Sequence, residues 1–139
     1  SDPLYQEIKE SGSIVMERVS HDLVLDYLNA SDVYLLLLFD DMILPFSDIG
    51  MIQLESLAMG TPDISSTMIH FIGTKEDRKK VGRIVRNEDE ALIALNDLLS
   101  NSHKYRYARQ VSEKYYSWER IARKNHEVYD KLTESYYGV

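Results

Sequence analysis

The feature that most constrains the fold is the apolar run VYLLLLF, at residues 33–39. It is apolar on both of its alternating faces, and it lies between a Ser-Asp pair and an Asp-Asp pair. A run of this length is too short to cross a membrane, but it is typical of a central parallel strand that helices cover on both faces. The run therefore predicts an α/β fold.

Strands and helices are predicted to alternate along the rest of the chain. Segments rich in β-branched residues predict strands over 13–19, 61–65 and 81–85, and residues 66–80 are expected to be irregular. Periodic apolar patterns predict helices over 3–11, 21–31, 51–59, 88–100, 103–116 and 118–136. This order predicts a Rossmann-like parallel sheet flanked by helices. We expect one domain over 1–139, in which 103–139 form a helical carboxyl-terminal tail.

The helix predicted over 51–59 has signals at both ends. Ser47 or Asp48 is expected to cap its start, and Gly60 can adopt the left-handed conformation that ends a helix. The helices that follow it carry apolar stripes at helical spacing. The residues expected to face the core are Leu92, Leu95, Leu98, Leu99, Tyr105, Ala108, Val111, Tyr115, Ile121, Val128, Tyr129 and Leu132.

The composition excludes several classes of function. A net charge of -7 over 139 residues disfavours nucleic-acid binding, and the small basic cluster around Lys79, Lys80 and Arg83 is more typical of a solvated face than of an anion site. The absence of cysteine excludes disulfides and thiolate metal sites. The histidines lack metal-ligand spacing, so we expect no metal: His21, His70, His103 and His126.

Gly50 and Glu55 are the candidate ligand-binding residues. In open α/β sheets, ligands bind beyond the carboxyl ends of the strands, where helices begin. A glycine at the start of such a helix lets a phosphate approach N–H groups that have no partner within the helix. A partly buried carboxylate at Glu55 needs donors, and sugar hydroxyls can supply them. The alternative from spacing alone is that Glu55 lies on the polar edge of the helix and meets only water.

The order of motifs resembles one known family. The segments are ASDVYLLLL, SDIGMIQLESLAMGTPDIS, VGRIV, DEALIALNDLLSN and ARQVSEKYYSWERIARKNHEVYDKL. Together they are similar to the carboxyl-terminal domain of the group 1 retaining glycosyltransferases, which have two facing Rossmann-like domains (the GT-B architecture). That family carries the pattern Glu-x-Phe-Gly-x-x-x-x-Glu-Ala-x-Ala-x-Gly-x-Pro, and its last helix starts with Tyr-Ser-Trp-Glu. The resemblance covers nearly the whole chain.

The resemblance assigns roles to five retained positions. Glu55 corresponds to the second glutamate of the family's pair, which holds the ribose hydroxyls of a nucleotide-sugar donor. Gly50, with the backbone of Met51 and Ile52, corresponds to the turn that receives the donor diphosphate. Val19 falls in the loop where the family grips the base. A helix start that faces a departing diphosphate stabilises its charge, so these roles are chemically consistent.

The chain departs from the family pattern at the catalytic position. The first glutamate of the pair is Ser47 here, and the usual aromatic residue before the glycine is Ile49. Ser47 forms hydrogen bonds but carries no charge. The segment before it is longer than in the family, and Asp40 or Asp41 is the candidate to supply the missing carboxylate. Asp63 stands where the family has an apolar strand residue, and residues 66–80 replace a glycine-rich loop.

The resemblance implies a transferase that moves a hexose from a nucleotide diphosphate sugar to a glycan or lipid-linked acceptor, in polysaccharide biosynthesis. It implies no cofactor, no metal and a cytoplasmic location, with peripheral membrane association of the parent protein. The family's basic pair and its acceptor-binding domain lie upstream of the matched motifs. We therefore expect a fragment that is inactive when isolated.

Two alternatives stay open at this stage. One is a non-catalytic, degenerate domain that binds a protein partner through its tyrosine-rich tail, since the chain has 10 tyrosines and most lie after residue 104. The other is an epimerase of the same two-domain architecture.

Overall fold

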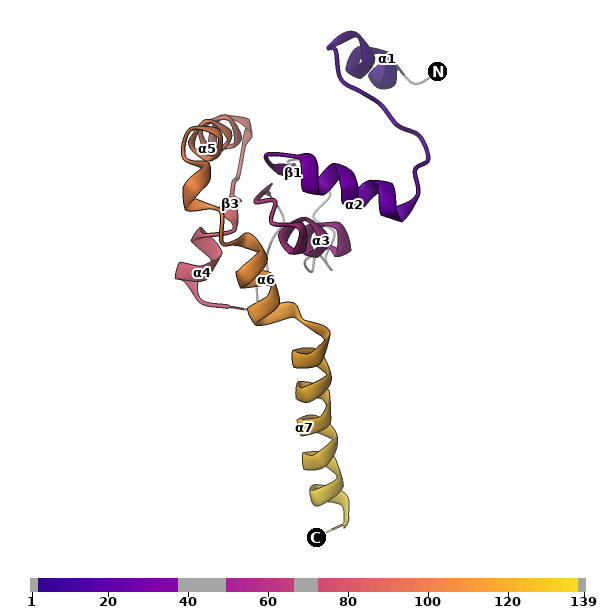
Figure 1. The fold of residues 1–139 in the computed structure, drawn as a ribbon, viewed down its shortest axis with the longest axis vertical. Coiled ribbons are helices and arrows are strands. Elements are labelled where there is room, and N and C mark those ends of the chain that lie inside the picture. Colours follow the sequence, from indigo (N-terminus) through magenta and orange to yellow (C-terminus); the bar gives the residue numbers. More distant parts are fainter. Residues whose placement is uncertain (1–2, 38–49, 67–72, 138–139) are drawn as a thin grey trace.

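The computed structural model describes residues 3–37, 50–66 and 73–137. Three short strands and the helices around them form a body, from which the last helix projects, and the first helix also lies apart from this body (Figure 1). The strands are β1 (Tyr34–Leu36), β2 (Asp63–Ser65) and β3 (Gly82–Ile84). The helices are α1 (Pro3–Glu10), α2 (His21–Ala30), α3 (Met51–Met59), α4 (Lys75–Lys79), α5 (Glu88–Ser100), the 3₁₀ turn η1 (Ser102–Lys104), α6 (Ala108–Tyr116) and α7 (Trp118–Tyr137).

The sheet is parallel, with β2 in the middle of the order β1-β2-β3. Tyr34 lies beside Asp63, and Asp63 lies beside Gly82, so the three strands start in register. All three lie within segments that the sequence predicts as strands. The run at 33–39, predicted as the central strand, instead gives β1 at an edge of the described sheet, where Leu35 is half exposed. The prediction of an α/β fold with a parallel sheet and flanking helices is therefore confirmed at this level.

Helices pack on both faces of β2, because its side chains alternate. Ile64 faces α5 and belongs to an apolar cluster that includes Ala94 and Leu98. Asp63 faces the other way and meets α3. On that side, a second cluster joins Leu57 of α3 to helix α6, and its buried members are Leu57, Val81, Ala108 and Val111.

Three of the predicted secondary-structure assignments are wrong. The helix predicted over 103–116 begins only at Ala108, after the turn η1. Residues 13–19 form no strand, although their sequence is rich in β-branched residues. None of the described strands pairs with them, and Ile14 is 85% exposed. A β-branched segment forms a strand only where a neighbouring strand can pair with it. Within residues 66–80, expected to be irregular, α4 forms from Lys75 to Lys79, where Thr74 accepts a hydrogen bond from the N–H of Asp77.

The buried faces of two helices also differ from the prediction. In α5 the sheet is met by Ala91, Ala94 and Leu98, whereas Leu92 and Leu99 are exposed. Both sets of residues have helical spacing. The small side chains of Ala91 and Ala94 allow α5 to lie close to β2. In α7 the predicted core residues are all exposed, because no described element packs against them: Ile121, Val128, Tyr129 and Leu132.

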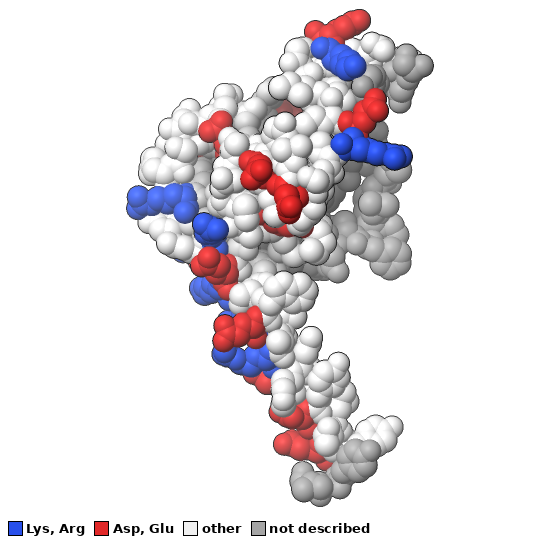
Figure 2. Space-filling model, turned by 45° about the vertical axis from the view of Figure 1, so that its right-hand side comes forward, with Lys and Arg blue, Asp and Glu red and all other residues white. Residues whose placement is uncertain are grey.

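Helix α7 extends away from the body (Figure 1). Charged groups line one side of it and uncharged groups the other (Figure 2). Its most exposed large apolar side chains include Trp118, which is 82% exposed. None of the helices in the described ranges is both long and apolar enough to span a bilayer.

Gly82 has a packing role that predicts a sharp loss of stability. A Cβ at this position would lie 1.8 Å from the carbonyl oxygen of Asp63, and the φ angle is +153°, which side chains disfavour. We expect Gly82→Ala to lower the free energy of unfolding by about 4 kcal/mol or more, as measured by urea unfolding.

Gly60→Ala is the matched control for this variant. Gly60 also has a positive φ, of +92°, but the nearest heavy atom to its added Cβ would be 3.9 Å away. Its cost should be limited to about 1–2 kcal/mol, the penalty for a left-handed residue. Equal losses in the two variants would contradict the steric role of Gly82.

Candidate functional site

Helix α3 lies between two parallel strands in the chain, so it begins on the side of the sheet where β1 ends, and α2 precedes β1. Each runs back along the parallel sheet before the next strand starts, α2 into β1 and α3 into β2. The two helices also contact one another. The first residue of α2, His21, reaches Glu55 in the middle of α3.

Glu55 and His21 form an ion pair across these two helices. Nε2 of His21, the first residue of α2, lies 2.8 Å from Oε1 of Glu55 in α3. The Glu55 side chain is 20% exposed and that of His21 is 64% exposed. The alternative in which Glu55 meets only water is therefore wrong: its carboxylate is partly buried and bound to a donor.

The charge of His21 depends on this partner. The hydrogen bond to Glu55, and then its negative charge, raise the pKa of His21 above its usual value, and Asp22 adds a smaller effect in the same direction. The imidazole therefore keeps its proton to a higher pH than a free histidine, and the pair carries a charge-assisted hydrogen bond.

The start of α3 differs in one respect from the prediction. Its N-cap is Gly50 and not Ser47 or Asp48, and the side-chain oxygen of Gln53 accepts a hydrogen bond from the N–H of Gly50 at 3.2 Å. One N–H that the resemblance gives to a diphosphate is thus already bound. Met51 and Ile52, in the first turn, are exposed, and a helix start leaves such N–H groups without a helical partner.

Val19 lies in the loop that leads into α2, two residues before His21, and it is exposed. The loop that contains Val19 leads directly to His21, which contacts Glu55 of α3. Ser47, Ile49, Asp40 and Asp41 lie outside the described residues.

A buried hydrogen-bond network connects α3 to β2 and α4. Asp63 is fully buried; Gln53 donates to its Oδ2 at 3.2 Å, and Arg78 donates to its Oδ1 at 3.1 Å. Because Gln53 also holds the N–H of Gly50, hydrogen bonds run from α4 through β2 to the first turn of α3. Burial raises the pKa of Asp63 to about 6, although Arg78 and Gln53 act to lower it.

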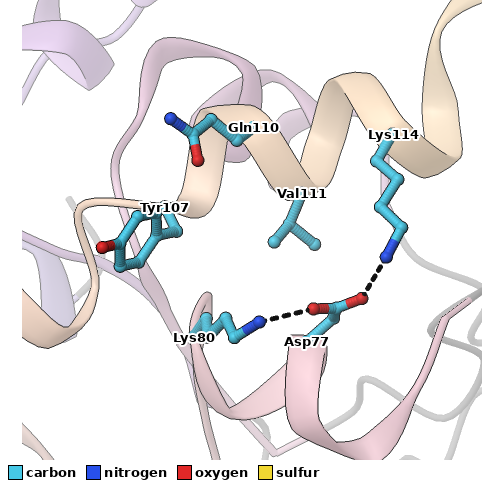
Figure 3. A pocket seen from close by; sticks show the side chains of 6 residues that line it. All are labelled: Asp77, Lys80, Tyr107, Gln110, Val111 and Lys114. Carbon is cyan, nitrogen blue, oxygen red and sulfur yellow. Dashed lines mark hydrogen bonds and ion pairs between the residues drawn. The ribbon is translucent and has the colours of Figure 1, made fainter.

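A hollow of about 450 Å³ lies between α4 and α6 (Figure 3). Asp77 accepts hydrogen bonds there from Lys80 and Lys114, each at 2.8 Å, and from the Tyr115 hydroxyl at 2.7 Å. These bonds hold the pKa of Asp77 far below its usual value, with Lys114 the largest cause. The two lysines share the single carboxylate of Asp77, and because Lys114 and Tyr115 belong to α6, these bonds join α6 to α4.

His21 is the site residue that sequence reasoning missed. It was one of the scattered histidines, and 34 positions separate it from its partner. No local spacing marks such a pair, although His21 directly follows the N-cap Ser20 and is the first residue of its helix. No group of three or more metal-ligating side chains occurs within 3–37, 50–66 and 73–137.

Comparison with known proteins leaves the family open. No protein-family model, curated protein or solved structure matches the chain.

The raised pKa of Asp63 predicts how stability changes with pH. The folded state binds this proton more tightly than the unfolded chain, whose aspartate has a pKa of 3.8. The stabilisation is therefore complete below pH 3.8 and is lost as the pH rises through 6. A shift of this size corresponds to about 3 kcal/mol. The free energy of unfolding of the wild type, relative to Asp63→Asn, should fall by that amount between about pH 4 and pH 7.

Urea unfolding of both proteins across this pH range measures the difference. Asp77 and Asp97 have lowered pKa values, so they lose stabilisation as the pH falls, but they titrate in both proteins and cancel. Parallel curves for the two proteins would show that Asp63 has an ordinary pKa.

Proposed function

We propose that this chain is the donor-binding domain of a retaining glycosyltransferase. The parent protein would move a hexose from a nucleotide diphosphate sugar to a glycan or lipid-linked acceptor. The observation that carries the proposal is the Glu55 carboxylate, which is partly buried and bound through one oxygen to His21. It lies in α3, one turn from the helix start at Gly50.

The chemistry of a nucleotide sugar fits these groups. A carboxylate accepts two hydrogen bonds from neighbouring ribose hydroxyls, and a helix start stabilises a nearby diphosphate. A base would lie against the loop of Val19. In this proposal the described sheet is part of a Rossmann-like domain, and that domain is one half of a two-domain enzyme.

Catalysis in the proposal depends on stabilising the departing diphosphate and uses no metal. The first-turn N–H groups of Met51 and Ile52 would contribute to this, and Ser47 would occupy the position of the family's first glutamate. The acceptor would bind to a second domain, so this chain alone is expected to bind the donor without turning it over.

Nucleotide titration tests the proposal. We expect UDP, GDP or ADP, or a sugar derivative of one of them, to bind in isothermal calorimetry with a Kd of about 1 mM or lower. Glu55→Ala should weaken this binding at least about tenfold, because the ribose hydroxyls lose a charged acceptor.

Glu113→Ala is the matched control, because Glu113 is an exposed helical glutamate that pairs only with Arg109 of its own helix, at 3.8 Å. Its affinity should equal that of the wild type. If no nucleotide binds to the wild type at millimolar concentration, the proposed function is wrong.

A second candidate function, a non-catalytic interaction module, is favoured by α7. Its large apolar side chains form a stripe at helical spacing and are exposed to water: Trp118, Ile121, Val128, Tyr129, Leu132 and Tyr136. A continuous stripe of this kind marks a surface for protein contact. The charged residues of its other face are mixed in sign, which disfavours an anionic membrane as the target.

This second candidate predicts weak self-association of the chain through α7 at high concentration. Sedimentation equilibrium should show concentration-dependent mass, and Val128→Lys with Leu132→Lys should abolish it. The control, Glu127→Gln with Glu134→Gln, changes the net charge by the same amount on the polar face and should associate as the wild type does. Association that survives the lysine pair would contradict a role for the stripe.

A further inference from the structure

The two oxygens of Glu55 have different surroundings. Oε1 lies 2.8 Å from Nε2 of His21. For Oε2, the structure records no hydrogen bond to any residue within the described ranges. The carboxylate is thus held at one oxygen and can accept hydrogen bonds at the other.

The position of His21 is fixed by its own helix. Ser20 caps α2, with its side chain accepting a hydrogen bond from the N–H of Leu23 at 3.3 Å. The other end of α2 is tied to the segment after α3, where the Thr61 hydroxyl donates to the carbonyl of Leu28. The imidazole therefore projects from a helix that is anchored at both ends, and a donor on such an element holds its acceptor in one orientation.

We propose that His21 is the positioning residue of this site: by holding Oε1 of Glu55, it presents Oε2 to the two hydroxyls of a ribose and selects ribonucleotides over 2′-deoxyribonucleotides. The inference rests on the proposed function, and it adds to it a residue and a substrate preference. His21 acts through Glu55 and does not itself touch the ribose.

The preference follows from the hydrogen bonds that a deoxyribose cannot make. A deoxy ligand leaves the carboxylate with one hydroxyl fewer, and a hydrogen bond to a charged group is worth about a tenfold to hundredfold change in affinity. That difference is realised only if Oε2 faces the sugar. Without His21 the carboxylate can rotate towards water, and the affinities for the ribonucleotide and the 2′-deoxyribonucleotide then become similar.

The ionisation of His21 gives a second signature. The groups that act on it are Glu55 of α3 and Asp22 of its own helix, and both favour the protonated ring. Neutral histidine donates a weaker hydrogen bond than the imidazolium ion. Discrimination between ribose and deoxyribose should therefore fall as the pH rises through the pKa of His21.

The test compares dissociation constants of nucleotide pairs by calorimetry at pH 6, 7 and 8. The pairs are ADP with dADP, GDP with dGDP and UDP with dUDP. The ratio of the two constants is used, because ionisation of the diphosphate is the same within a pair and cancels. The proteins are the wild type, His21→Gln, His21→Ala and, as a control, His126→Ala, whose histidine is also exposed and pairs with a carboxylate, Asp130.

We expect the wild type and His126→Ala to favour the ribonucleotide about tenfold or more at pH 6, and less at pH 8. His21→Gln should keep part of the preference, because its amide also donates, but should show no pH dependence. His21→Ala should lose most of the preference at every pH. The circular dichroism spectrum of each variant checks that it folds.

The outcomes separate this inference from the proposed function. If no ribonucleotide binds to the wild type, the proposed function is overturned and the inference falls with it. If ribonucleotides bind to the wild type, and His21→Ala keeps the same ratio and the same pH dependence, the inference alone is overturned.

Discussion

The rest of the structure depends on the burial of one carboxylate, Asp63, in the middle strand of a small parallel sheet. A charge at that place is costly unless donors surround it, and Gln53 and Arg78 supply them from elements on either side of β2 in the chain. The backbone of Gly82 lies directly against the same residue. An apolar residue would pack more simply here, but it would leave the amide of Gln53 and the guanidinium of Arg78 to be satisfied elsewhere. A substitution at Asp63, Gly82, Gln53 or Arg78 therefore affects the packing or hydrogen bonding of the other three.

Helix α3 separates structural and ligand-binding roles on its two faces. Gln53 and Leu57 face inward, to Asp63 and to the apolar cluster with α6. Glu55 faces outward, to His21. Because successive residues of a helix point about 100° apart, a stable inner face can hold the helix start at Gly50 while the outer face stays available to a ligand. Asp77 and Asp97 likewise connect neighbouring elements, because each carboxylate accepts hydrogen bonds from several donors.

The sequence predicts what is encoded locally. The strand at 34–36 follows from an apolar run, and those at 63–65 and 82–84 follow from segments rich in β-branched residues. The helix α3, with its end at Gly60, follows from periodicity and a glycine. The failures concern contacts between distant residues. Residues 13–19 are rich in β-branched residues, but none of the described strands pairs with them. The apolar residues of α5 lie on two faces at helical spacing, and contact with the sheet determines which face is buried. The His21–Glu55 pair joins separate helices, and the role of Asp63 depends on the burial and donors that the folded chain brings to it.

The projection of α7 sets the limit of the cooperatively folded part of the chain. A 20-residue helix is about 30 Å long, and its hydrogen bonds are almost all its own. In proteins most of the stability of a helix comes from packing of its apolar face, and the apolar side chains of α7 are exposed. The cooperatively unfolding unit thus ends near Ser117, and we expect α7 to unfold without unfolding the sheet. The chain then behaves as two coupled systems, a body with one unfolding transition and a helix–coil equilibrium attached to it, so spectroscopic helicity and the integrity of the core report on different parts.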